Sequence, residues 1–146
     1  MAAARFDEYK PTWDSQQFFQ ICGTDKGLAN ELISLYKQQF DSSMQKLMKA
    51  AKEKDQPNSI LFSHDIKGSS ANLGCKAVSE KSLELEKLAR AGKLSDLEAK
   101  IPELATVQEK TMEIFTKVLA DFPEEDEYDD EDDEDEDEEE YDEEDD

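Results

Sequence analysis

The residues best suited to chemistry lie in a stretch of eleven residues from His64 to Gly74, which holds the only histidine of the 146-residue chain. The stretch has helical periodicity, because Phe62, Ile66, Ser69 or Ser70, and Leu73 follow one another at three- and four-residue steps and form a largely apolar stripe. His64 lies about 200° around such a helix from both Phe62 and Ile66. If the stripe faces a core, the imidazole faces water.

Two neighbours of the histidine favour phosphoryl chemistry at its ring. Lys67 follows three residues later on the same face, where its ammonium can neutralise a phosphoryl group on a ring nitrogen. Gly68 follows four residues later, although glycine inside a helix costs roughly 1 kcal/mol relative to alanine. We interpret this glycine as a gap that leaves the ring open to an incoming protein. The stretch therefore predicts an exposed histidine that takes and gives up a phosphoryl group.

The full stretch reads His64-Asp65-Ile66-Lys67-Gly68-Ser69-Ser70-Ala71-Asn72-Leu73-Gly74. Its pattern, His-x-x-Lys-Gly-Ser-Ser-x-x-x-Gly, resembles the signature of histidine-containing phosphotransfer (HPt) proteins, in particular the stand-alone intermediates of eukaryotic phosphorelays. A weaker match in helix order extends from about Trp13 to Phe122. The resemblance implies that His64 accepts a phosphoryl group from the aspartate of one response-regulator receiver domain and passes it to the aspartate of another. One of these receivers is expected to belong to a hybrid histidine kinase.

The resemblance also implies roles for residues around the histidine. His64 is the expected nucleophile, with the outward Nε2 favoured over Nδ1, while Lys67 stabilises phosphate charge and Gly68 gives the receiver access. Gln39 corresponds loosely to a polar residue that HPt proteins often place near the histidine. The residues expected to border the receiver-docking surface are Leu61, Ala71, Asn72 and Cys75.

The serines after Gly68 fit two roles. Ser69 and Ser70 can bond backbone groups and allow close helix packing, or they can help to hold the phosphate. They lie five and six residues after His64 and are rotated away from it, which favours packing. Gly74 fits the end of the helix.

Several activities have no support in the sequence. It contains neither a Gly-x-x-x-x-Gly-Lys-[Ser/Thr] loop nor a Gly-x-Gly-x-x-Gly motif, so we expect no ATP site and no autokinase activity. The chain is then a phosphohistidine carrier rather than an enzyme. Cys22 and Cys75 are too few for a zinc site or a disulfide framework. We expect no cofactor or metal of its own, with Mg²⁺ supplied by the partner receiver domain.

The charge is concentrated at the C-terminus. Residues 123–146 contain 21 acidic side chains, whereas the rest of the chain carries 18 acidic and 17 basic residues. We expect this tail to be disordered, because its like charges repel and it has little apolar surface to bury. The near-neutral remainder gives no nucleic-acid footprint. The tail alone supports an alternative function, an acidic-tailed helical adaptor or chaperone for basic partners such as histones.

The remaining sequence predicts one all-α domain over residues 13–122, an antiparallel four-helix bundle with a short extra N-terminal helix. The long helices are expected at about 26–54, 58–73, 76–91 and 95–122, with a capping box from Ser95 to Glu98 and a kink or restart at Pro102. Residues 1–12 are expected to form a flexible, extended lead-in. The apolar stripe of the first long helix is predicted to comprise Leu28, Leu32, Leu35, Tyr36, Ser43, Met44, Leu47 and Ala51.

No apolar run approaches the roughly 18 residues that span a bilayer, so no membrane association is expected. The low cysteine content favours a reducing compartment. We expect a cytoplasmic monomer, and its small size also fits passage into the nucleus.

Overall fold

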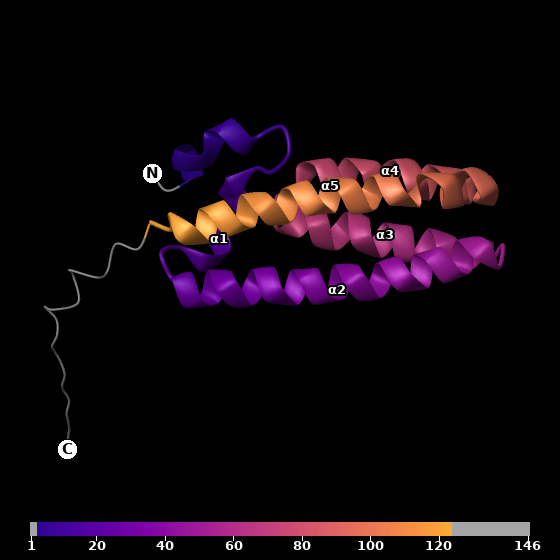
Figure 1. The fold of residues 1–146 in the computed structure, drawn as a ribbon, viewed down its shortest axis with the longest axis horizontal. Helices are drawn as coiled ribbons and strands as arrows, with labels where there is room; N and C mark the ends of the chain where they lie inside the picture. The colour runs from indigo at the N-terminus through magenta and orange to yellow at the C-terminus, as the bar shows by residue number, and fades with distance from the viewer. Residues whose placement is uncertain (1–2, 124–146) are drawn as a thin grey trace, which may run out of the picture.

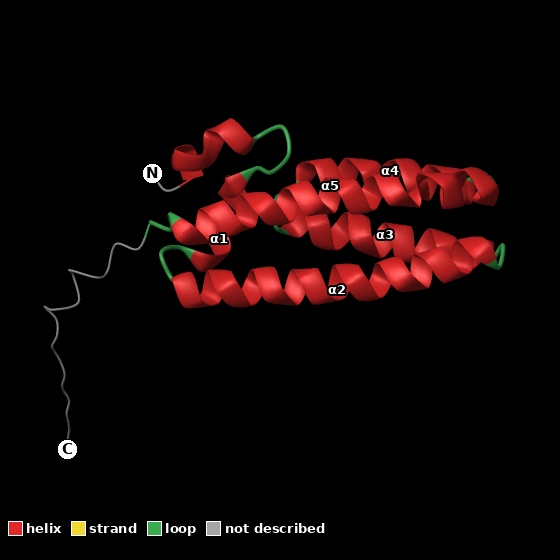
Figure 2. Cartoon of the chain, in the orientation of Figure 1, coloured by secondary structure: helices red, strands yellow, loops and turns green. Residues whose placement is uncertain are grey.

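Four long helices form the body of the computed structural model, which describes residues 3–123. They are α2 (Lys26–Lys52), α3 (Gln56–Asn72), α4 (Lys76–Arg90) and α5 (Leu94–Ala120). Each packs on the next in chain order, and α5 closes the ring against α2 (Figure 1). Within the described range all regular structure is helical (Figure 2). The prediction of an all-α four-helix bundle is confirmed.

The N-terminal segment covers the end of the bundle where α2 begins and α5 ends (Figure 1). It consists of a 3-10 helix, η1 (Ala3–Tyr9), and a short helix, α1 (Ser15–Cys22). Phe6 in η1 is buried and stacks on Phe19, and both rings lie near the fully buried Trp13. The expectation of an extended lead-in was therefore wrong for η1, because an aromatic cluster anchors it to the domain.

Aspartates begin three of the helices. Asp14, Asp25 and Asp55 each precede a helix and accept a hydrogen bond from a backbone N–H in its first turn. Asp55 starts α3 at Gln56, two residues earlier than predicted. α2 correspondingly ends at Lys52.

The start of α5 differs from its prediction. The capping box from Ser95 to Glu98 does not form, because α5 already begins at Leu94 and the Ser95 hydroxyl accepts a hydrogen bond from Lys54. Nor does the helix restart at Pro102, which lies inside α5 on its exposed face. The carbonyl that a proline leaves without a helical partner can bond water at such a position.

The face of α3 that meets the core is built largely from small polar residues. Its buried members are Ser59, Ser63, Ile66 and Ser70. The Ser63 hydroxyl donates back to the Ser59 carbonyl, which satisfies it within the helix. Small side chains let α3 lie close to α4, and the Ser79 hydroxyl of α4 donates to the backbone carbonyl of Lys67. This close contact brings α4 side chains within reach of the histidine.

The turn between α3 and α4 packs against the start of α1. Gly74 has φ +77°, and its carbonyl accepts a hydrogen bond from the Asp14 N–H at 2.8 Å. A Cβ atom at this position would overlap the Asp14 carbonyl oxygen, so only glycine fits. The Trp13 indole donates to the adjacent Leu73 carbonyl, also at 2.8 Å. No helix within residues 3–123 is both long and apolar enough to cross a membrane.

Candidate functional site

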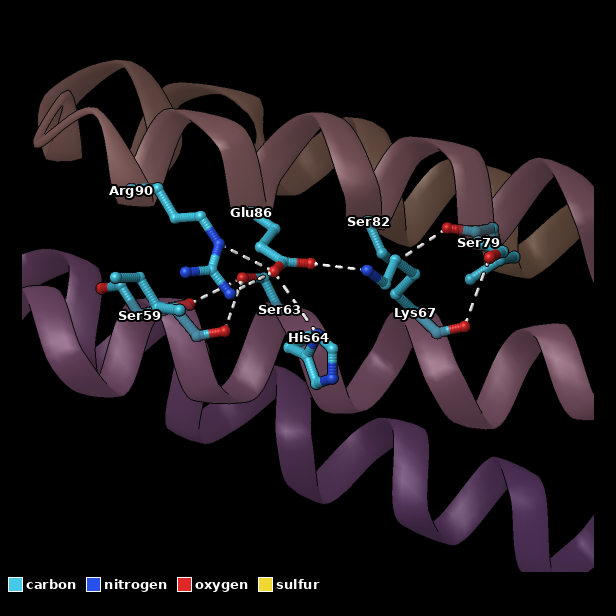
Figure 3. Close-up of polar contacts among 10 residues, drawn as sticks. Ser59, Ser63, His64, Lys67, Ser79, Ser82, Glu86 and Arg90 are labelled. Atoms are coloured by element: carbon cyan, nitrogen blue, oxygen red, sulfur yellow. Dashed lines mark hydrogen bonds and ion pairs between the residues drawn. The ribbon is translucent and has the colours of Figure 1, made fainter.

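The imidazole of His64 projects from α3 beside α4, and 55% of its side chain is exposed. Ser63 and Ile66 point into the core, which turns His64 outward at the edge between the two helices. Its Nδ1 atom lies 3.4 Å from the Glu86 Oε2 atom of α4 (Figure 3). A carboxylate only accepts hydrogen bonds, so this contact favours a proton on Nδ1, which leaves the lone pair on Nε2.

Glu86 gathers two cations beside the histidine. Its carboxylate is 5% exposed, with Lys67 Nζ 3.0 Å from Oε1. Arg90, one turn further along α4, donates to Oε2 from Nε at 2.9 Å and from Nη2 at 2.7 Å. Burial pushes the pKa of the Glu86 carboxyl upward, but Arg90 and Lys67 outweigh burial and hold that pKa below its usual value. Glu86 is therefore ionised at neutral pH.

Open space adjoins the ring at Gly68. This glycine is exposed, and a Cβ atom built on it meets no atom within 4 Å. Leu61, Ala71 and Asn72 of α3 are also exposed, and Leu61 is 48% exposed, while their role as docking residues stays a prediction. A partner protein can therefore approach His64 closely on this side.

Cys75 does not belong to this surface. It is fully buried, and burial raises the pKa of its thiol to about 12. The prediction that it borders the docking surface was wrong, because the turn after α3 directs this residue into the core. It behaves there as a small apolar side chain.

Ser69, Ser70 and Gly74 lie at packing positions. The buried Ser70 hydroxyl lies 2.9 Å from the Tyr36 hydroxyl, and Tyr36 in turn donates to Gln108 Oε1 at 2.9 Å. The Ser69 hydroxyl donates to the Ile66 carbonyl of its own helix.

Gln39 lies elsewhere. It is exposed on α2 and lines a groove of about 450 Å³ with Asp65 and Ser69. This groove borders α2, whereas Glu86 reaches the histidine from α4. The structure records no contact between Gln39 and His64, so its role near the phosphate stays a prediction.

Sequence reasoning missed Glu86 and Arg90. In the sequence, the spacing of Val78, Ser82 and Leu85 marks the inner face of α4 but gives no reason to expect a buried acid next to them. The available signal was the spacing of four residues between Glu86 and Arg90, since a Glu-x-x-x-Arg pair on one helix face forms an ion pair.

A comparison with known families identifies the fold. The model of the Hpt domain matches residues 31–113, which is more than half of the chain. This chain belongs to the Hpt domain family. The match runs from α2 through most of α5 and includes His64, Glu86 and Arg90.

The chain is also similar to the phosphorelay intermediate protein rdeA of Dictyostelium discoideum. The two are 32% identical over 110 residues, which make up 75% of this chain and 42% of that relative. The Hpt chain thus spans less than half the length of this relative. No solved structure matches this chain.

Proposed function

We propose that this Hpt protein is a phosphorelay intermediate that carries a phosphoryl group on His64 between two receiver domains. The observation that carries the proposal is the geometry of one ring. Nδ1 of His64 faces the Glu86 carboxylate, and the structure records no partner for Nε2 among residues 3–123. Family membership and the similarity to a phosphorelay intermediate support the same role.

The proposed transfer uses few groups from this chain. The Nε2 lone pair attacks the phosphorus of a receiver's aspartyl phosphate as the bond from phosphorus to the carboxylate oxygen breaks. The aspartate leaves with that electron pair, and the Nδ1 proton stays directed at Glu86. Phosphoryl transfer depends chiefly on positioning and charge neutralisation, to which Lys67 and Arg90 contribute. In the second step an aspartate of the other receiver displaces His64.

The partner supplies the rest. We propose that the receiver brings Mg²⁺ and docks over the surface formed by Leu61, Gly68, Ala71 and Asn72. The chain then needs neither an ATP site nor a cofactor. A monomer that works in the cytoplasm and passes into the nucleus fits this carrier role.

A labelling experiment tests the proposal. The protein is mixed with a receiver domain phosphorylated on aspartate, and label on the protein is followed in acid and in alkali. We expect label that is stable in alkali and labile in acid, as for phosphohistidine, and none on His64→Gln. Labelling of the His64→Gln variant, or no labelling of the wild type by several receivers, would reject the proposal.

A further inference from the structure

The buried Glu86 carboxylate contacts His64 and also forms ion pairs with both cations of the site, Lys67 and Arg90. Lys67 and Arg90 can neutralise a phosphoryl group, and each contacts the same Glu86 carboxylate that lies 3.4 Å from Nδ1 of His64. A phosphoryl group on Nε2 would have to share them with a carboxylate that is already there.

The two cations are held differently. Arg90 makes two hydrogen bonds to Oε2, whereas the Lys67 contact with Oε1 is an ion pair without hydrogen-bond geometry. Arg90 is 58% exposed and Lys67 is 29% exposed, so both side chains remain accessible to solvent and to a phosphoryl group on the exposed His64 ring. Lys67 is therefore the more easily released of the two.

Charge decides the direction of the effect. A neutral imidazole that gains a phosphoryl dianion on Nε2 and keeps its Nδ1 proton changes its net charge by about −1. That negative charge arrives next to an ionised carboxylate with little water around it, where Coulomb interactions are stronger than in bulk water. The carboxylate therefore raises the free energy of the phosphorylated state relative to the unphosphorylated one.

We infer that Glu86 is a positioning residue that shortens the time for which the phosphoryl group stays on His64, by drawing Lys67 and Arg90 away from it. The inference rests on the proposed function and extends it. A protein arranged in this way is a ready donor to the second receiver rather than a store of phosphohistidine.

The test uses three variants of the full chain. Glu86→Gln keeps an oxygen that can accept from Nδ1 but removes the negative charge. Arg90→Gln removes a cation. Glu84→Gln is the matched control, since Glu84 lies on the same helix but pairs with Lys81 and Lys100 instead of His64.

Each variant is charged with phosphoramidate, and the half-life of its phosphohistidine is measured after the donor is removed. In the charging step Nε2 forms a bond to phosphorus while the bond from phosphorus to nitrogen in phosphoramidate breaks and ammonia leaves. We expect the half-life to lengthen about tenfold in Glu86→Gln. We expect it to shorten in Arg90→Gln and to remain unchanged in Glu84→Gln.

These opposite directions separate the inference from a purely structural role. A variant that merely loosens the site exposes the phosphoryl group to water, so shorter half-lives in both Glu86→Gln and Arg90→Gln would overturn the inference. An unchanged half-life in Glu86→Gln, or an equal lengthening in Glu84→Gln, would also overturn it. Because phosphoramidate needs no receiver, failure of the proposed function would show separately, as lack of transfer from receiver domains.

Discussion

At the scale of single residues, the proposed reactivity of His64 depends on the groups around its ring. The ring is exposed, one of its nitrogens faces a carboxylate, and open space lies beside it at Gly68. The sequence predicted the exposure and the gap from helical spacing alone. It did not predict that Lys67 is paired with Glu86, because that contact depends on the register between α3 and α4.

Substitutions at Gly68 test access to the ring. Gly68→Ala adds a methyl group in open space at an ordinary helical position, so we expect the free energy of unfolding to rise by up to about 1 kcal/mol. Gly68→Leu should fold equally well but hinder a docking receiver. We expect its transfer rate from a phosphorylated receiver to fall at least tenfold, while labelling by phosphoramidate stays within a factor of about two. A normal transfer rate in Gly68→Leu would mean that the receiver approaches from another side.

At the scale of the elements, the close packing of α3 and α4 builds the site. Serines on the inner face of α3 allow this contact, but serine is polar, so an apolar stripe in the sequence does not reveal most of these buried positions. The stripe predicted for α2 was also partly wrong, since Leu35 was predicted to be in the core but is 53% exposed, and Ile33 is buried instead. Helix existence follows from local spacing, whereas the exact buried face depends on neighbouring helices.

Gly74 couples the turn between α3 and α4 to the start of α1. In Gly74→Ala the Cβ atom would overlap the Asp14 carbonyl oxygen at a positive φ, so we expect a loss of about 3 kcal/mol or more in the free energy of unfolding. Gly92→Ala is the matched control, since φ is +76° there but the nearest atom to the Cβ is 4.0 Å away. Its loss should be about 1 kcal/mol. Equal losses in urea unfolding would show that the close approach at Gly74 is unimportant.

Glu86 also makes the joint between α3 and α4 sensitive to acid. Its pKa is lowered in the folded state, so its ionised form contributes stability that is complete above the unfolded-state pKa of about 4.3. That contribution is lost as the pH falls through the lower folded-state pKa. Relative to wild type, Glu86→Gln should therefore gain stability between about pH 5 and pH 3. Urea unfolding of both proteins across this range measures the change, and parallel curves would contradict it.

At the scale of the whole molecule, charge separates a near-neutral domain from its acidic C-terminus. The predicted tail, residues 123–146, lies almost entirely outside the described residues. Its 21 acidic side chains remain a property of the sequence. We expect them to compete with a receiver for the basic groups around the docking surface, Lys67 among them.

Deletion of residues 123–146 tests this competition. We expect transfer from a phosphorylated receiver to become faster at low ionic strength, because attraction between exposed charges is then least screened. The difference should shrink as salt is added. Equal transfer rates with and without the tail at every salt concentration would show that the tail does not affect transfer.

The shuttle itself is tested most directly by a relay with two receiver domains, the first of them phosphorylated and labelled. We predict that label leaves the first receiver, passes transiently through this protein and accumulates on the second. With His64→Gln, it should remain on the first receiver. Label that reaches the second receiver equally well with His64→Gln, or that never appears on the wild-type protein, would contradict the account.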